Sequence, residues 1–260
     1  MKKLGVIGYP LAHTLSPAIQ GAAIRACDLD LTYEAYETAP DRLDSFMTEL
    51  RRPDWLGVNV TVPHKQAVMP YIQELMDDAR LIGAVNTIVN DGGRLEGHNT
   101  DAAGFIADLE ERLGRVEGKR VVVLGAGGAA RAVCFSLKDR AQNVWVVNRT
   151  AEKAKRLAFD FGLEPGTAEC LRQCELIVNC TSAGLHGDDS PILDESLPDG
   201  VDLYDLIYNP PVTRLMRAVQ ARGGRAMNGL GMLVRQAAVA FHIWTGLEPP
   251  INTMFEAVNA

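Results

Sequence analysis

Short apolar runs rich in valine, isoleucine and leucine alternate with stretches of helical periodicity along most of the chain. Runs of this length are typical of buried strands, and the stretches between them are typical of helices. Regular alternation of the two predicts βαβ units, and therefore an α/β fold with mostly parallel sheets. The strands are expected at 3–7, 31–36, 55–60, 85–90, 94–98, 120–124, 143–147, 176–179 and 201–205, and the helices at 16–27, 40–50, 65–76, 127–138, 151–161 and 230–244.

The alternation is interrupted once, by a polar and glycine-containing segment at residues 110–120. A second series of strands and helices begins after it, so we expect two α/β domains with a boundary near residues 100–118. The strands 85–90 and 94–98 are expected to form a hairpin, because Asp91-Gly92-Gly93 between them is a typical hairpin turn. The final stretch, 246–260, is too short for a third domain and is expected to pack back on one of the two.

The composition agrees with this fold class and excludes several other classes of protein. The 260 residues are 47% hydrophobic and 23% charged, close to the average of globular proteins. The net charge is −7 and the basic residues form no block, so a nucleic-acid partner is disfavoured. No apolar run is long enough to cross a membrane, and residues 1–10 are interpreted as the start of a strand rather than a signal peptide.

Five cysteines are present, at positions 27, 134, 170, 174 and 180. Their odd number, with several in apolar segments, indicates free thiols in a reducing compartment, and so a cytoplasmic protein. The spacing of Cys170, Cys174 and Cys180 fits no common zinc pattern, so no metal site is expected.

The sharpest local signal is a glycine-rich turn between the strand 120–124 and the helix after it. Gly125 suits a tight turn, Gly127 allows a pyrophosphate to approach the backbone, and Ala130 takes the third position of a G-x-G-x-x-G/A pattern. The N–H groups of the helix start then face the phosphates. The same pattern also occurs in tight strand–helix turns that bind no ligand. The expected cofactor-binding residues of the turn are Gly125, Ala126, Gly127, Gly128 and Ala129.

The end of the next strand discriminates between the two nicotinamide dinucleotides. An NAD site usually has Asp or Glu there to bind the ribose 2′-hydroxyl, whereas this chain has Asn148, Arg149 and Thr150, with Lys153 following. A guanidinium suits a 2′-phosphate, so the pattern favours NADP. The alternative is a solvated helix start, although cations are mildly disfavoured in a first helical turn.

Three polar clusters follow strand ends, where ligands bind in open α/β sheets. One contains Asn59, Thr61 and Lys65, and another runs from Gly97 to Asp101. A lysine and a carboxylate together suffice to transfer a proton to or from an alcohol. From the residues alone, the favoured interpretation is that Lys65 is a surface lysine and Asp101 caps the following helix. The third cluster holds the hydroxyls of Thr14 and Ser16, and Ser16-Pro17 also has the pattern of a helix start.

Taken in order, these clusters resemble the shikimate dehydrogenase family over nearly the whole chain. The segments that carry the resemblance are Gly8-Tyr9-Pro10 with His13-Thr14-Leu15-Ser16-Pro17, Asn59-Val60-Thr61-Val62-Pro63-His64-Lys65, Gly83-Ala84-Val85-Asn86-Thr87, Asn99-Thr100-Asp101, the turn from Gly125 to Arg131, Asn148-Arg149-Thr150, Asn179-Cys180-Thr181-Ser182-Ala183-Gly184, Asp205-Leu206-Ile207-Tyr208-Asn209-Pro210, and Asn228-Gly229-Leu230-Gly231-Met232-Leu233-Val234-Arg235-Gln236.

The resemblance implies a substrate-binding catalytic domain at 1–101, a Rossmann-like NADP-binding domain at 102–236, and a C-terminal segment, 237–260, that packs back on the first domain. The implied reaction is the reversible NADPH-dependent reduction of 3-dehydroshikimate to shikimate, in the chorismate pathway to the aromatic amino acids. Shikimate and 3-dehydroshikimate are then the small-molecule partners, and the protein is expected to be a monomer or a homodimer.

The resemblance also assigns roles to individual side chains. Lys65 and Asp101 are the implied catalytic pair on either side of the reacting oxygen. The residues implied to hold the substrate carboxylate are Thr14, Ser16 and Tyr208, and those implied to bind the ring hydroxyls are Thr61, Asn86, Asp101 and Gln236. Further cofactor contacts are implied for Leu206, Gly229 and Asp77.

Two other functions remain open at this stage. The family most often has serine where this chain has Thr14, and the added methyl group stiffens χ1 beside the substrate carboxylate. A quinate or amino-shikimate dehydrogenase is therefore an alternative within the family. A regulatory protein that binds NADP without catalysis is a second alternative, but it would need neither Lys65 nor Asp101.

Overall fold

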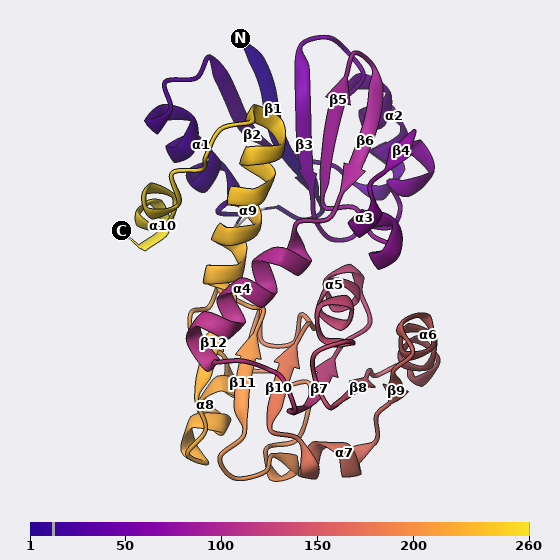
Figure 1. Ribbon diagram of the computed structural model, residues 1–260, viewed down its shortest axis with the longest axis vertical. Coiled ribbons are helices and arrows are strands. Elements are labelled where there is room, and N and C mark those ends of the chain that lie inside the picture. The colour runs from indigo at the N-terminus through magenta and orange to yellow at the C-terminus, as the bar shows by residue number, and fades with distance from the viewer. Residues whose placement is uncertain (12–13, 260) are drawn as a thin grey trace. The chain divides into compact units, whose positions relative to one another are not determined.

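The computed structural model of the chain describes residues 1–11 and 14–259 (Figure 1). Ala12, His13 and Ala260 lie outside the described residues. His13 is the one of these that belongs to a motif noted in the sequence. Contacts divide the chain into two compact units, Met1–Gly104 with Leu233–Ala260, and Phe105–Met232. Within the described part, no helix is both long and apolar enough to cross a membrane.

The described residues of the first unit form a six-stranded mixed sheet in the order β2-β1-β3-β5-β6-β4. Strands β1, β2 and β3 run parallel, whereas β5 and β6 form the hairpin that Asp91-Gly92-Gly93 predicted, with antiparallel pairing also between β3 and β5. The strand bounds are β1 (Lys2–Gly8), β2 (Leu31–Glu37), β3 (Trp55–Val60), β4 (Glu74–Leu75), β5 (Thr87–Asp91) and β6 (Arg94–His98).

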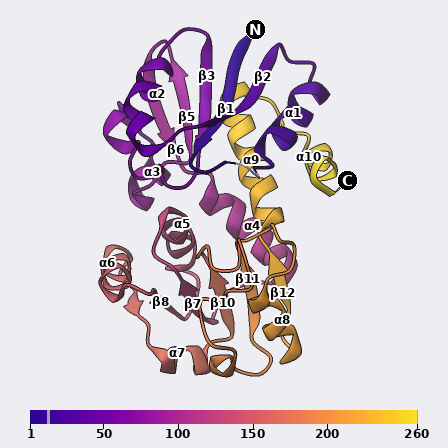
Figure 2. The same ribbon diagram turned by 180° about the vertical axis from the view of Figure 1, so that it is seen from behind.

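Helices cover both faces of this sheet because successive side chains of its strands point to opposite sides. Helix α9 (Leu230–Thr245) lies across one face, in front of β1 in Figure 1 and behind it in Figure 2. Leu4 and Val6 of β1 join the core on that side, and Ile7 joins the core on the other. The other helices of this unit are α1 (Ser16–Ala26), α2 (Leu43–Glu49), α3 (Asp77–Ile82) and α10 (Ile251–Asn259).

The helix expected at 65–76 is wrong. The segment instead consists of turns, a short 3₁₀ helix at Met69–Tyr71 and strand β4. Pro70 lacks the N–H that an α-helix would need there, and its ring disfavours the preceding helical turn. The chain therefore turns back directly after Lys65, whose carbonyl accepts the Val85 N–H at 2.7 Å.

The described residues of the second unit form a six-stranded, fully parallel sheet in the order β9-β8-β7-β10-β11-β12. Numbered within the unit, this is 3-2-1-4-5-6, the strand order of a Rossmann fold, and it confirms the expected α/β class. The order reverses at β7, and ligands bind at such a reversal. The strands are β7 (Arg120–Leu124), β8 (Asn143–Val147), β9 (Glu164–Pro165), β10 (Leu176–Asn179), β11 (Asp202–Asp205) and β12 (Ala226–Asn228).

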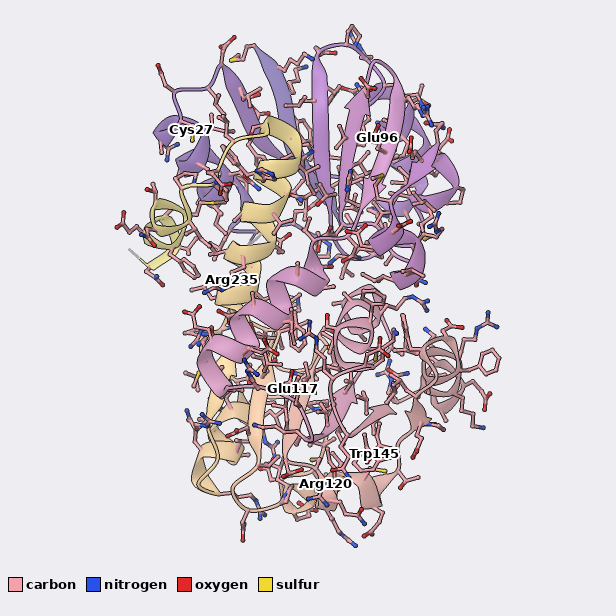
Figure 3. The ribbon with its side chains drawn as sticks, viewed as in Figure 1. Cys27, Glu96, Glu117, Arg120, Trp145 and Arg235 are labelled. Carbon is pink, nitrogen blue, oxygen red and sulfur yellow. The ribbon has the colours of Figure 1, made fainter. Side chains whose placement is uncertain are left out.

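The central strands of this sheet are buried on both faces, which explains their continuous apolar sequence. Val121 and Val123 belong to one core cluster, and Val122 and Leu124 to the other. The covering helices are α5 (Gly128–Leu137), α6 (Ala151–Phe161), α7 (Ala168–Gln173) and α8 (Arg214–Ala221). All five cysteines, which fall within the described residues, are free thiols; Cys27 is labelled in Figure 3.

Both passages of the chain from one unit to the other lie inside helices. In α4 (Asp101–Leu113), Phe105 and Leu109 belong to a core of the second unit. In α9, Met232 belongs to that same core, whereas Val234 belongs to a core of the first unit. Contacts therefore divide the chain at 104/105 and 232/233, a few residues from the expected 101/102 and 236/237, because packing rather than a change of secondary structure separates the two units.

Replacing Gly231 with alanine should destabilise the protein by about 1–3 kcal/mol, the usual cost of overpacking. A Cβ at Gly231 would lie 1.9 Å from Asp108 Oδ1. Asp108 cannot move freely, because the Tyr204 hydroxyl donates to its Oδ2 at 2.7 Å. Urea unfolding measures the effect. Gly21→Ala in α1 is the matched helical control, since its Cβ would meet only the end of the Arg25 side chain, at 3.3 Å. Equal stability of the two variants would show that Asp108 moves aside at no cost.

Candidate active site

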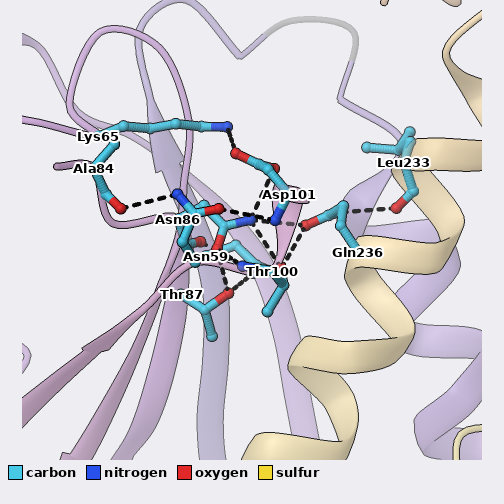
Figure 4. A network of polar contacts seen from close by, with 10 residues as sticks. Asn59, Lys65, Ala84, Asn86, Thr87, Thr100, Asp101, Leu233 and Gln236 are labelled. Carbon is cyan, nitrogen blue, oxygen red and sulfur yellow. Dashed lines mark hydrogen bonds and ion pairs between the residues drawn. The ribbon is translucent and has the colours of Figure 1, made fainter. Parts of the chain in front are cut away.

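A buried lysine–carboxylate pair lies at the end of strand β3 in the first unit. Lys65 Nζ is 2.5 Å from Asp101 Oδ2, and the two side chains are 13% and 5% exposed (Figure 4). Lys65 is in the turn after β3, and Asp101 is the first residue of α4. Removing two charges from water is costly unless further hydrogen bonds satisfy them, so this pair is neither a surface lysine nor a simple helix cap.

Asn86 supplies one of those further hydrogen bonds. Its Nδ2 donates to Asp101 Oδ1 at 2.9 Å, which leaves Oδ2 of the carboxylate to Lys65. The same amide nitrogen lies 3.3 Å from Gln236 Oε1, and the Asn86 Oδ1 accepts the Thr100 N–H at 2.8 Å. Gln236 is anchored in turn by donating from Nε2 to the Leu233 carbonyl at 2.7 Å. The structure thus brings four of the expected site residues into one hydrogen-bonded cluster.

The local sequence explains why these residues meet. Asn99 accepts the Asp101 N–H at 3.1 Å and donates from Nδ2 to the Ala84 carbonyl at 2.9 Å. It therefore ties the start of α4 to the segment that carries Asn86. Gly83 allows that segment to leave α3 in a left-handed conformation, with φ of 70°.

The other expected substrate-binding residues of the first unit are Thr14, Ser16 and Thr61. Thr14 Oγ1 accepts the Ser16 N–H at 3.3 Å at the start of α1, and Ser16 is buried. Thr61 follows β3 closely beside Gly8, where a Cβ would lie 2.4 Å from Thr61 Cγ2. Among the described residues, no hydrogen bond joins Thr14 or Thr61 to the Lys65–Asp101 pair. Tyr208 belongs to the second unit.

Three further polar residues lie around the pair: Asn59, which the sequence placed in one polar cluster with Lys65, and Thr87 and Tyr33, for which no role was expected. Thr87 Oγ1 donates to Asn86 Oδ1 at 3.0 Å, and Asn59 Nδ2 donates to Thr87 Oγ1 at 3.1 Å. The hydroxyl of Tyr33 donates to Asn59 Oδ1 at 2.7 Å. Asn59 and Thr87 belong to motifs noted in the sequence, but Tyr33 gave no signal beyond that of an aromatic strand residue.

In the second unit, the glycine-rich turn has the geometry of a dinucleotide site. Gly125 has φ of 109°, and a Cβ there would lie 3.1 Å from the Cys180 backbone, so only glycine fits. Gly127 differs, because a Cβ would meet nothing within 4 Å. It precedes α5, which begins at Gly128 with no side chain capping its N–H groups. The turn therefore presents open space and free backbone donors where a phosphate would bind.

The cations after β8 divide into two groups. Lys155 and Arg156 form ion pairs with Glu152 and Asp160. Arg149 and Lys153 are exposed, and neither forms an ion pair with any described residue. Asn148 Nδ2 donates to the Thr150 carbonyl at 3.0 Å and shapes this turn. Arg149 and Lys153, which have no acidic partner among the described residues, are therefore the cations here that can bind an anionic ligand.

Nearby cations of the second unit are already engaged. Arg131, one turn into α5, is 2.8 Å from Asp160 and lies over the Phe161 ring. That ion pair, together with Arg156, keeps the pKa of Asp160 below its usual range. Arg131 is thus held by the protein itself and is a poorer candidate for a ligand than Arg149.

The loop after β11 carries Leu206 and Tyr208. Gly229 lies against it, since a Cβ would be 2.3 Å from the Leu206 carbonyl oxygen. Asp205 anchors the loop, and accepts from the Asn179 Nδ2 at 2.9 Å, the Ile207 N–H at 3.1 Å and the Thr213 hydroxyl at 2.7 Å. Burial raises the pKa of Asp205, although these donors oppose the shift.

Asp77, the remaining residue expected to contact the cofactor, belongs to the first unit. It lies in the first turn of α3, is strongly exposed and forms an ion pair with Arg80. Within the described residues, no group of three or more His, Cys, Asp or Glu side chains is arranged to hold a metal ion.

The first unit can thus perform acid–base chemistry on an alcohol or a carbonyl group. A partly buried ammonium stabilises negative charge that develops on a neighbouring oxygen, and can donate a proton to it. The second unit has the features needed to bind a dinucleotide with an additional phosphate. Together these are the components of a dehydrogenase.

Comparisons with known proteins agree with this chemistry. Three family models match the chain: "Shikimate dehydrogenase substrate binding domain" at residues 6–88, "Shikimate / quinate 5-dehydrogenase" at residues 108–190, and "Shikimate 5'-dehydrogenase C-terminal domain" at residues 229–258. The shikimate dehydrogenase (NADP(+)) of Carboxydothermus hydrogenoformans is 42% identical, over 99% of this chain and 96% of its own.

Solved structures give the same result. The shikimate 5-dehydrogenase of Thermus thermophilus, solved in complex with NADP(H) and shikimate, is 41% identical and has a TM-score of 0.93. That alignment covers 100% of this chain and 99% of the other. A quinate dehydrogenase of Corynebacterium glutamicum, in complex with NAD, is 30% identical with a TM-score of 0.88 over 98% of both chains.

Proposed function

The chain belongs to the shikimate dehydrogenase family, and we propose that it reduces 3-dehydroshikimate to shikimate with NADPH, reversibly, in the chorismate pathway to the aromatic amino acids. The observation that carries the proposal is the buried Lys65–Asp101 pair, held by Asn86 within reach of Gln236. Full-length relatives that are NADP-dependent shikimate dehydrogenases support both the substrate and the cofactor.

The side chains of the first unit perform the acid–base part of this reaction. NADPH, when bound, supplies the hydride for the C3 carbonyl carbon. Lys65 stabilises the charge that develops on the carbonyl oxygen and donates the proton from Nζ. Asp101 orients Lys65 through the 2.5 Å contact and binds a neighbouring hydroxyl. In the oxidation direction Lys65 takes the proton back.

The remaining site residues bind and orient the substrate. We propose that Thr14, Ser16 and Tyr208 hold its carboxylate. The ring hydroxyls are proposed to contact Thr61, Asn86, Asp101 and Gln236, three of which lie in one hydrogen-bonded cluster. Orientation of this kind converts a bimolecular step into an effectively unimolecular one, which accounts for part of an enzyme's rate.

The second unit fits NADP rather than NAD. The proposed cofactor residues are Gly125, Ala126, Gly127, Gly128 and Ala129 for the pyrophosphate, Asn148, Arg149, Thr150 and Lys153 for the 2′-phosphate, and Leu206 and Gly229 for the nicotinamide. The open space at Gly127 supports these roles, and so does the absence of an ion pair between Arg149 or Lys153 and any residue that the structure describes. A cofactor contact of Asp77 is proposed on the family resemblance only. We further propose that the protein is cytoplasmic and acts as a monomer or homodimer.

A quinate dehydrogenase is the second candidate function. It is favoured by Thr14, which stands where the family most often has serine, and by the 30% identical quinate dehydrogenase among the structural relatives. Shikimate is preferred because the curated relatives at about 40% identity are shikimate dehydrogenases.

The absorbance of NADPH tests the proposal directly. We expect the purified protein to reduce NADP with shikimate, and kcat/KM to be higher for shikimate than for quinate or amino-shikimate. A higher kcat/KM for quinate would select the second candidate. No absorbance change with any of the three alcohols, in a folded protein that binds NADPH, would indicate a regulatory protein without catalysis.

A further inference from the structure

A buried chain of hydrogen bonds runs across the face of the first sheet that α9 covers, and it ends at the catalytic carboxylate. Its outer member is Tyr33 of β2, which packs against Trp244 of α9 with ring centroids 6.2 Å apart. The Tyr33 hydroxyl donates to Asn59 Oδ1 at 2.7 Å. Tyr33 and Asn59 are 8% and 6% exposed, so water has little access to this hydrogen bond. Burial raises the pKa of Tyr33, and a hydrogen bond with the Ser16 side chain opposes that shift.

The inner links continue in the same direction (Figure 4). Asn59 Nδ2 donates to Thr87 Oγ1 at 3.1 Å, since the two residues face each other across β3 and β5. Thr87 Oγ1 donates to Asn86 Oδ1 at 3.0 Å. Asn86 Nδ2 then donates to Asp101 Oδ1 at 2.9 Å. In every one of these hydrogen bonds the donor is thus the residue farther from Asp101, and the acceptor is the residue nearer to it.

The direction of the links follows from what each group can donate or accept. An ionised carboxylate only accepts, so Asn86 must turn its nitrogen to Asp101 and its oxygen to Thr87. The Thr87 hydroxyl can rotate, and would be equally able to accept from a neighbour or donate to it. Because Asn59 Nδ2 already donates to the Thr87 hydroxyl, the hydroxyl proton of Thr87 is free to be donated to Asn86 Oδ1.

Tyr33 holds the outer end of this arrangement. Asn59 Nδ2 also donates to the Asn86 carbonyl at 3.3 Å, so its Oδ1 must face Tyr33. Without the Tyr33 hydroxyl, that buried oxygen would lose the donor that satisfies it. An unsatisfied buried acceptor is costly, and Asn59 would shift to find another partner. Such a shift would weaken the hydrogen bond from Asn59 to Thr87. The orientation of the Asn86 amide toward Asp101 would then be less well fixed.

We propose that Tyr33 is a positioning residue for the Lys65–Asp101 pair and that it acts through Asn59, Thr87 and Asn86. The role is positional rather than a proton relay, because two of the links are amides, which do not exchange a proton readily between oxygen and nitrogen. The inference rests on the proposed function, since it concerns the efficiency of that reaction.

Replacing Tyr33 with phenylalanine should lower kcat for shikimate oxidation by about 3- to 10-fold, comparable with the loss of one buried hydrogen bond. The variant keeps the aromatic ring and its packing. The KM for NADP should stay within about twofold, because the altered groups all belong to the first unit. Steady-state kinetics at 25 °C, on protein shown by circular dichroism to be folded, measure both values.

Tyr36→Phe is the matched control. Tyr36 lies on the same strand but packs against Phe46 and Trp55 on the opposite face of the sheet. Its hydroxyl donates to the exposed Glu34. Tyr36→Phe therefore removes the same atom as Tyr33→Phe but leaves the hydrogen bonds between Tyr33 and Asp101 intact. We expect Tyr36→Phe to keep the unmodified kcat.

A double-mutant cycle with Thr87→Val tests whether the two hydroxyls act along one path. Valine keeps the β-branched shape of this fully buried strand residue and removes only its hydroxyl function. Thr87→Val alone should lower kcat by about 10-fold, and the Tyr33→Phe/Thr87→Val variant should be no slower than Thr87→Val. If the loss of kcat in the double variant equals the product of the two single losses, the proposal is overturned, because the two hydroxyls would then act independently.

The outcomes separate this inference from the proposed function. An inactive unmodified protein would refute the function. An active protein whose Tyr33→Phe variant keeps normal kcat would refute the inference alone. If Tyr33→Phe and Thr87→Val lower only the melting temperature, or fail to fold, the hydroxyls stabilise the sheet and do not position the site.

Discussion

Replacing Lys65 with alanine should lower kcat by roughly 10²–10⁴-fold, the usual range for a lost general acid or base. The ammonium lies 2.5 Å from Asp101 and is only 13% exposed, and a neutral water in its place would supply no positive charge to stabilise a developing oxyanion. NADPH affinity should be retained, because the glycine-rich turn and the exposed cations belong to the other unit. Substrate affinity should change much less than kcat if Lys65 acts mainly in the transition state. Steady-state kinetics and NADPH fluorescence titration measure these three quantities.

Lys3→Ala provides the control for the loss of one lysine in the same unit. Lys3 also pairs with an aspartate, Asp54, at 2.8 Å, but both side chains are well exposed. An exposed pair contributes little to stability, and this one is not linked to the Asn86 cluster. We expect normal kcat in Lys3→Ala. A near-normal kcat in Lys65→Ala would remove Lys65 from the mechanism.

The fold was largely predictable because strand–helix alternation is a local signal. Asn143–Val147 and Ala151–Phe161 have the expected bounds, since buried strands and amphipathic helices differ in period. The helix expected after Lys65 is absent, because Pro70 lacks the N–H that an α-helix would need there and its ring disfavours the preceding helical turn. The short elements β4, β9 and α7 were not predicted, because tertiary contacts rather than a periodic sequence stabilise them. Helix α8 was not predicted either, although its buried Leu215, Met216 and Val219 follow a helical period.

The family was predictable from its ordered motifs, and this prediction is confirmed by the family models and the curated relatives. The geometry of the site was not predictable from residue patterns. Asn86 and Gln236 are 150 positions apart, and only the packing of α9 on the sheet brings their side chains together. The roles that the resemblance assigns to these residues remain predictions.

Tyr33 shows the limit of reading motifs. Its position within β2 predicts a buried aromatic residue, and nothing in the local sequence indicates that its hydroxyl reaches Asn59. That contact depends on the register between strands, because Tyr33 pairs with Leu4 and Leu4 with Gly57, two residues before Asn59 on the same face. Register across three strands is not encoded in any one of them.

Exchanging Arg149 for aspartate should remove most of the preference for NADP over NAD. A charge-assisted hydrogen bond contributes about 1.5–3 kcal/mol, and its loss lowers NADP affinity by roughly 10- to 150-fold. The aspartate would also repel a 2′-phosphate, whereas it suits the ribose 2′-hydroxyl of NAD. The ratio of kcat/KM for the two cofactors, measured with shikimate, reports the change.

The expected effect depends on Arg149 being available to the cofactor, and the structure supports this. Arg149, in the turn before α6, and Lys153, in its first turn, form no ion pair with the described residues, whereas Lys155 of α6 is paired with Glu152. Lys155→Asp introduces the same change of charge nearby and is the matched control; its cofactor ratio should stay close to that of the unmodified protein. If Lys155→Asp shifts the ratio as far as Arg149→Asp, the preference comes from the overall field of α6. Equal kcat/KM with NAD and NADP in the unmodified protein would instead show that these cations do not select the cofactor.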